Sequence, residues 1–168
     1  QRVHPCLINK ESRLSNVNGV LNAVIIEGKP VGKSVLQGEG AGPGPTTSAL
    51  VSDICSVLRG NIKYPFSMSV SKRKKIKSAD LSNKIFSSYI RLDVIDKKGV
   101  LSEITKLMSK NKISVKRLIQ NPLKQKKYAS IIMISHKSKD KNLKKCINSL
   151  SKKSFIVSKP KFIRIEEI

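Results

Sequence analysis

A glycine-rich run is the first stretch whose residues could do chemistry: Gly38-Glu-Gly-Ala-Gly-Pro-Gly-Pro-Thr-Thr47. Closely spaced glycines allow main-chain N–H groups to approach a phosphate or a ribose, and the positive end of a following helix favours negative charge. The run lacks the dinucleotide fingerprint, because Pro43 occupies the position of its third glycine. From spacing alone, a nucleotide contact and a purely structural turn both remain open.

A second stretch, Asp96-Lys-Lys-Gly99-Val-Leu-Ser-Glu-Ile104, places a glycine at the entry to a predicted helix. A glycine there leaves room for a small ligand, and the first amides of the helix can bind an amino-acid carboxylate. Asp96 could then meet the ammonium group of the ligand. A plain helix start explains the same residues, and chemistry alone favours that interpretation.

Other catalytic and metal-binding patterns are absent from the sequence. The run from Gly28 to Ser34 is one residue too short between its glycines for a phosphate-binding P-loop and is better explained as a hairpin turn. No nucleophile–base pair stands out, so we predict no catalytic residue in this chain. A zinc site needs clustered ligands, whereas the cysteines and histidines are dispersed, which predicts reduced cysteines and no metal: Cys6, Cys55, Cys146, His4 and His136.

The formal net charge of +23 is concentrated in the second part of the chain. Residues 1–60 hold six basic and four acidic residues, and residues 61–168 hold 28 and seven. Most of the basic residues are lysines, whereas base readout favours arginine, and the aromatic residues needed for stacking number only three Tyr and four Phe. The composition therefore favours a solvated lysine surface, with polyanion binding as the alternative.

Residues 1–60 are expected to be the edge of a larger α/β domain. Residues 20–28 and 34–37 read as strands, and a helix capped by Thr46 or Thr47 runs from the Pro45 entry to about Arg59, where Gly60 ends it. Two strands and a helix do not close a core, so the remainder of that domain is expected upstream of Gln1. No apolar run approaches 18 residues, which predicts no membrane span.

Residues 61–87 show no sustained periodicity and contain a basic run, residues 71–78. An exposed linker is the simplest interpretation, and a basic docking tail is the alternative.

Residues 88–168 alternate strands and helices in the order βαββαβ, which is the split-βαβ, ferredoxin-like arrangement. Asn111 is expected to end the first helix in a left-handed conformation, and Asp140 to cap the second. The bare sheet face and the sheet edges favour pairing with another copy. The predicted strands and helices are: strands 88–95 (with Tyr89 or Ile90 pointing inward), 113–119, 128–135, 155–157 and 162–165, and helices 100–108 and from 140 to about 150.

Several of these stretches resemble one protein family. Val3–Ile8, Val17–Gly28 and Gly38–Asp53 are similar to the end of the catalytic region of homoserine dehydrogenase. Tyr89–Ile104, Asn111–Ser114 and Pro160–Glu166 resemble an ACT domain. The resemblance covers nearly the whole chain and implies an α+β fold: a C-terminal ferredoxin-like ACT domain at 88–168, a linker at 61–87, and the strand–loop–helix tail of a dehydrogenase region at 1–60.

The resemblance implies an enzyme that reduces aspartate semialdehyde to homoserine with NADPH or NADH, in threonine, methionine and isoleucine biosynthesis. It implies that the glycine-rich loop lies beside the cofactor, with Gly42 as the expected contact and Ala41 and Gly40 as further candidates. The family's nucleotide fingerprint, catalytic lysine, substrate carboxylates and alkali-metal site would all lie upstream of Gln1. The fragment alone is therefore expected to be inactive.

The resemblance to ACT domains implies feedback by an amino acid, threonine in particular, and a homo-oligomer formed through paired ACT domains in the cytoplasm. Lys98 departs from the Pro or similar residue that the family usually has before the glycine. A free-standing ACT module and a basic nucleic-acid-binding protein are the rival interpretations. The residues expected near the effector are Asp96, Lys98, Gly99, Val100, Leu101, Asn111 and Ile113.

Overall fold

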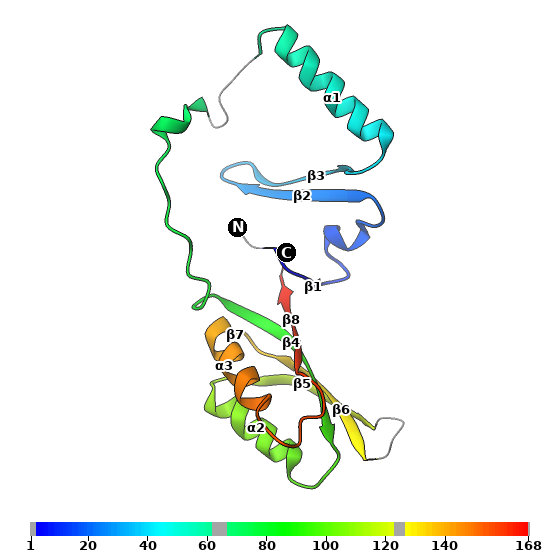
Figure 1. Ribbon diagram of the computed structural model, residues 1–168, viewed down its shortest axis with the longest axis vertical. Coiled ribbons are helices and arrows are strands. Elements are labelled where there is room, and N and C mark those ends of the chain that lie inside the picture. Colours follow the sequence, from blue (N-terminus) through cyan, green and yellow to red (C-terminus); the bar gives the residue numbers. More distant parts are fainter. Residues whose placement is uncertain (1–2, 62–66, 123–126, 168) are drawn as a thin grey trace. The chain divides into compact units, whose positions relative to one another are not determined.

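The computed structural model describes residues 3–61, 67–122 and 127–167, and the chain forms two compact units (Figure 1). One unit is Lys10–Ser78, and the other joins Gln1–Asn9 to Ala79–Ile168. Each of the predicted segments 1–60, 61–87 and 88–168 thus includes a few residues outside the described ranges. Within those ranges, no helix is both long and apolar enough to cross a membrane.

The described residues of the unit Lys10–Ser78 include a hairpin, a helix and the short 3-10 turns η1 (Arg13–Asn16) and η3 (Val70–Lys72). The strands β2 (Leu21–Gly28) and β3 (Gly32–Glu39) pair antiparallel along their full length, so both predicted strands are confirmed and the second is longer than expected. The run Gly28–Ser34 forms the predicted hairpin turn, with Gly28 opposite Gly32.

The helix α1 (Pro43–Leu58) begins earlier than predicted. The expected cap at Thr46 or Thr47 is wrong, because Gly42 occupies the N-cap position and Pro43 the first helical position, where proline's fixed φ suits a helix. The hydroxyl of Thr46 instead donates to the Gly42 carbonyl at 2.7 Å. Gly60, with φ +71°, follows the C-cap residue as predicted.

Apolar side chains of this unit are not buried. Among its described residues only Ser12 is buried, while Leu50, Ile54 and Val57 on α1 are 58, 56 and 59% exposed. These three residues recur at helical spacing and mark one apolar stripe. The expectation that two strands and a helix cannot close a core is therefore confirmed within the described residues.

The second unit is built on one sheet with the strand order β1-β8-β4-β6-β5. Its last four members alternate direction and are connected as βαββαβ, which confirms the predicted ferredoxin-like arrangement. The elements are β1 (Cys6–Ile8), β4 (Ile85–Ile95), α2 (Val100–Lys110), β5 (Val115–Pro122), β6 (Tyr128–Ser135), β7 (Ser138–Lys139), α3 (Asp140–Leu150) and β8 (Lys161–Glu166).

The N-terminal strand β1 belongs to this unit rather than to the hairpin unit. Its three residues run parallel to β8, and His4 Nε2 lies 3.9 Å from Glu166 Oε1. This pairing satisfies an edge that would otherwise expose main-chain donors and acceptors. Residues 1–60 thus contribute to both units.

The core lies between the sheet and the two helices. Along β4 the residues Ile90, Leu92 and Val94 alternate inward and are buried, so Ile90 rather than Tyr89 points to the core. They pack in one cluster with Ile104 and Met108 of α2, Ala129, Ile131 and Met133 of β6, Ile113, and Leu143, Cys146 and Leu150 of α3. One continuous apolar cluster of this kind is what makes a small two-layer domain self-supporting.

Helix α2 ends differently from the prediction. Asn111 is the C-cap residue with φ −93°, and the left-handed residue is Lys112, with φ +58°. The Lys112 N–H donates to Ser109 O at 2.8 Å and the Ile113 N–H to Met108 O at 3.0 Å, which is the Schellman pattern. The helix extends two residues beyond the predicted 108, and this moves the left-handed position past Asn111.

Two details near α3 and β8 also differ from the prediction. The N-cap position of α3 is Lys139, and Asp140 is the first helical residue. The Asp140 carboxylate does not cap the helix but pairs with Arg164 at 2.6 Å and with Lys144 at 2.9 Å. Residues 155–157 form no strand; Ile156 makes only one isolated bridge, to Val94.

Candidate functional site

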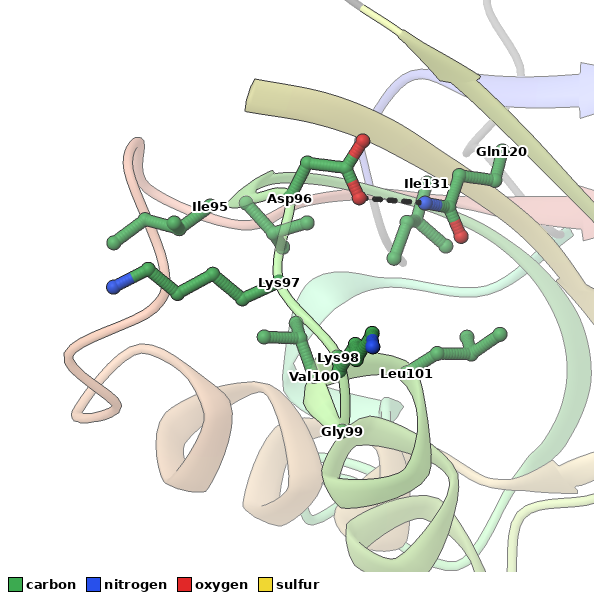
Figure 2. A pocket seen from close by; sticks show the side chains of 10 residues that line it. Ile95, Asp96, Lys97, Lys98, Gly99, Val100, Leu101, Gln120 and Ile131 are labelled. Carbon is green, nitrogen blue, oxygen red and sulfur yellow. Dashed lines mark hydrogen bonds between the residues drawn. The ribbon is translucent and has the colours of Figure 1, made fainter. Parts of the chain in front are cut away.

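A cavity of about 200 Å³ lies where β4 ends and α2 begins. Its wall combines the turn between these elements with residues of β5 and β6 from the neighbouring part of the sheet (Figure 2). The lining residues are Val94, Ile95, Asp96, Lys97, Lys98, Gly99, Val100, Leu101, Gln120 and Ile131.

Gly99 shapes the entry to α2. It is the N-cap residue, with a left-handed φ of +89°, and a Cβ added there would meet nothing within 4 Å. The requirement for glycine thus comes from the backbone conformation and not from lack of space. Among the described residues, the amides of Leu101 and Ser102, in the first turn at the positive end of the helix, donate to no main-chain acceptor.

Asp96 and Gln120 provide the polar side chains on the opposite wall. The Gln120 amide Nε2 donates to Asp96 Oδ1 at 3.4 Å, and the two side chains point toward one another (Figure 2). The main-chain N–H of Asp96 donates to Lys127 O at 2.8 Å, which fixes the turn. A contact of 3.4 Å is long for a hydrogen bond, so a ligand can replace it at low cost.

The cavity can therefore take a small zwitterion. Helix amides suit a carboxylate, Asp96 suits an ammonium group, and Val94 and Ile131 supply an apolar floor. Cavities of 300 Å³ and more hold drug-sized ligands, so about 200 Å³ matches something smaller.

The structure brings together five of the seven predicted effector residues: Asp96, Lys98, Gly99, Val100 and Leu101 all line this cavity. Asn111 and Ile113 lie at the other end of α2, roughly 16 Å away at 1.5 Å per residue. There the Asn111 amide donates to Leu107 O at 2.8 Å, and Ile113 is part of the core.

Gln120 and Ile131 line the cavity although sequence reasoning did not select them. They are direct neighbours across the β5–β6 ladder. Their link to Asp96 depends on strand pairing, which no local motif encodes. Gln120 lies one residue beyond the predicted strand 113–119 and Ile131 lies within the predicted strand 128–135, so their pairing depends on a strand register that the sequence does not specify.

The glycine-rich run forms a tight turn between β3 and α1. The Gly40 N–H donates to Val20 O at 2.9 Å, and a Cβ at Gly40 would overlap the Asn22 side chain, 1.4 Å from its Nδ2. Gly42 has φ +116°, a conformation that other residues rarely adopt. Both glycines thus have structural reasons to be present.

The turn also offers a defined set of main-chain donors. Pro43 and Pro45 have no N–H group, and the Thr46 N–H is used by Gly42 O at 3.2 Å. This leaves the amides of Ala41, Gly42 and Gly44, which donate to no main-chain group within the described ranges. Three outward amides at a helix start can bind an anionic or ribose oxygen.

Two titratable groups with shifted pKa values, Asp140 and Cys146, are not among the residues that line the cavity. Burial would raise the pKa of the Asp140 carboxyl, but hydrogen bonds from Lys144 and Arg164 outweigh it and hold that pKa below its ordinary value. Burial raises the pKa of the Cys146 thiol to about 11. In the described part of the chain, no three His, Cys, Asp or Glu residues gather where they could hold a metal.

Two protein families match different parts of the chain. Residues 1–55 match the family model described as Homoserine dehydrogenase, and residues 88–152 match that of the ACT domain. The homoserine dehydrogenase of Helicobacter pylori is 32% identical over 98% of this chain and 39% of its own length. That of Neisseria gonorrhoeae is 30% identical over 99% of this chain and 40% of its own length.

A solved structure is similar to nearly the whole chain. The crystal structure of a homoserine dehydrogenase from Thiobacillus denitrificans superposes with a TM-score of 0.82 at 29% identity, covering 99% of this chain and 38% of that one. The chain thus spans about two fifths of the length of the relatives it matches.

Proposed function

Because the chain belongs to the homoserine dehydrogenase family, of which it carries the C-terminal region and an ACT domain, we propose that it is part of an enzyme that interconverts L-aspartate 4-semialdehyde and L-homoserine. The pathways served are those to threonine, methionine and isoleucine. The observation that carries the proposal is the likeness to one crystallised homoserine dehydrogenase across both units of the chain.

A nicotinamide cofactor, NADPH or NADH, supplies the hydride when bound. In this chain the fitting residues are those of the glycine turn, whose amides at Ala41, Gly42 and Gly44 face outward. We assign Gly42 the main contact, because its φ of +116° holds the turn in the shape that exposes them. Gly40 is needed for the same turn, because a Cβ at that position would overlap the Asn22 side chain. With no catalytic residue identified in these 168 residues, the chain alone should not turn over substrate.

The exposed stripe of α1 supports the same proposal. Leu50, Ile54 and Val57 present apolar surface that a stable protein normally covers. In the complete enzyme, the remaining part of the dehydrogenase region would cover it. A free-standing ACT module leaves this stripe, and the family match at residues 1–55, without explanation.

For the ACT unit we propose an amino-acid effector, threonine. Its carboxylate would accept hydrogen bonds from the amides of Leu101 and Ser102, and its ammonium group would pair with Asp96. Gln120, released from its long contact with Asp96, would bind the hydroxyl. Lys98, in place of the usual proline-like residue, adds a cation near the carboxylate.

We also propose that the ACT units pair as homo-oligomers in the cytoplasm. The strand β5 pairs with β6 alone among the described strands, and its side chains Leu118 and Ile119 are 36 and 45% exposed. An edge strand with exposed apolar residues is suited to pairing with another copy. Three free cysteines agree with a reducing compartment.

Calorimetric titration of the chain with threonine tests the effector proposal. Saturable binding is expected, and Asp96→Asn should weaken it by about tenfold, the effect of losing one charge-assisted contact. Asp53→Asn is the matched control, because Asp53 is exposed on α1, and its binding should equal that of the parent chain. Absence of heat with threonine and with every other amino acid would reject an effector role for the cavity.

A further inference from the structure

A second groove lies in the same unit as the effector cavity and shares none of its lining residues. It has a volume of about 440 Å³ and forms where the start of β4, the end of α2 and the β7–α3 junction meet. Its lining residues are Ile85, Lys112, Lys137, Ser138, Lys139, Lys141 and Asn142. Four of these seven are lysines and none is acidic.

Main-chain hydrogen bonds hold the groove in shape. In the β4–β7 ladder Ile85 lies opposite Lys139. The Asp140 N–H donates to Lys84 O at 2.9 Å, and the Lys141 N–H to Ser82 O at 3.0 Å. The lysines therefore project from a fixed backbone, although their side chains are exposed.

Only part of the positive charge is neutralised by the protein. Lys137 Nζ pairs with Glu167 Oε2 at 2.6 Å, and Lys141 lies close enough to Asp80 to contribute to lowering the pKa of that carboxyl. Within the described ranges, neither Lys112 nor Lys139 forms an ion pair. The Ser138 hydroxyl is also buried without a hydrogen-bond partner among the described residues.

Lys112 occupies a backbone position that normally selects glycine. Its φ of +58° is that of the left-handed residue in a Schellman motif, where a lysine is strained and a glycine is not. A strained residue that adds charge to a groove points to a role other than ending the helix.

We propose that this groove binds a small molecule carrying two or more phosphate groups. Lysine ammonium groups bind phosphate as point charges, and a set of four matches a ligand with several negative oxygens. No aromatic residue lines the groove, so stacking of nucleic-acid bases has no support there. The site is separate from the proposed dehydrogenase and effector functions and does not depend on either.

Titration of the 168-residue chain with inorganic pyrophosphate tests the site. One saturable binding event is expected. The double variant Lys139→Gln/Lys141→Gln should weaken it by about tenfold or more. The double variant Lys145→Gln/Lys159→Gln removes the same charge from exposed lysines that do not line the groove, and should change the affinity less than about twofold.

The variant Lys112→Gly distinguishes a loss of pyrophosphate binding from a loss of folding. This variant should raise the melting temperature, because glycine relieves the left-handed strain, while pyrophosphate affinity falls. Unchanged affinity in Lys112→Gly, no saturable binding by the parent chain, or equal weakening in both double variants would overturn the proposal. Tighter binding of a single-stranded oligonucleotide that pyrophosphate does not displace would overturn it too, in favour of a diffuse nucleic-acid surface.

Discussion

The two units of this chain differ in how they use apolar residues. Residues 79–167 bury a continuous cluster between a sheet and two helices, whereas Lys10–Ser78 exposes most of its apolar side chains. Similar hydrophobic patterns therefore differ in burial, because burying an apolar face needs a second layer, and within the described residues only the unit with the sheet and two helices buries such a face. The comparison predicts that one unit is stable by itself and that the other depends on further protein.

The largest expected difference is in thiol reactivity. Cys6 is exposed, Cys55 in the coreless unit is half-buried, and Cys146 is buried with its pKa raised to about 11. Labelling of Cys146 should be about a thousandfold slower than that of Cys55, because it requires opening of the core and a thiolate that burial disfavours. Labelling by a thiol reagent with mass analysis measures the three rates. Equal rates for Cys55 and Cys146 would remove the distinction between the units.

A pair of truncations measures the same difference in free energy. Leu92→Ala in the core should lower the free energy of unfolding by about 3 kcal/mol, through lost burial and the cavity left behind. Ile54→Ala on the exposed stripe of α1 should change it by less than about 0.5 kcal/mol. Urea denaturation monitored by circular dichroism gives both values. A cost for Ile54→Ala close to that of Leu92→Ala would show that α1 has a partner in this chain.

Removing the buried ion pair of Asp140 should have a smaller effect on the free energy of unfolding. Its carboxylate contacts Arg164 and Lys144, and Arg164 also lies over the rings of Phe86 and Phe162, 5.9 and 5.7 Å from their centroids. Asp140→Asn should lower the free energy of unfolding by about 2 kcal/mol at neutral pH, since it leaves the half-buried guanidinium of Arg164 without its counter-charge. Asp53→Asn is the exposed control and should be neutral.

The pH dependence of this cost has a definite sign. The folded pKa of Asp140 lies below the ordinary value of 3.8, so the carboxylate stabilises the fold above that value. This stability is lost as the pH falls through the lower folded pKa. The difference between the parent chain and Asp140→Asn should therefore shrink as the pH falls below about 4. A difference that stays constant down to pH 2 would show that the charge of Asp140 is not involved.

The fold was largely predictable where the pattern of apolar residues within one segment is enough to indicate a strand or a helix. Alternation along β4 and the helical period of α2 depend on side chains that face one core, so both were found. The N-terminal strand β1 was missed because its three residues pair with β8 at the far end of the chain. Lys112 at the left-handed position could not be anticipated, since the usual preference for glycine or asparagine pointed to Asn111.

The candidate site likewise contains residues that the sequence groups together and residues that only strand pairing brings to it. Asp96 and Gly99 belong to one continuous turn, so the sequence was enough to group them. Gln120 reaches the cavity only through the β5–β6 register. Pro43 and Pro45 lack an N–H group in any fold, whereas the use of the Thr46 N–H by Gly42 O depends on α1 beginning at Pro43.

We propose that this chain is the regulatory end of a homoserine dehydrogenase. The most direct measurement compares the complete protein with the 168-residue chain in an assay of NADPH and NADH oxidation with aspartate semialdehyde, with and without threonine. If this proposal is right, the complete protein is active, threonine inhibits it through Asp96, and the chain alone is inactive. Turnover by the chain alone, or a complete protein with no activity on this substrate, would contradict it.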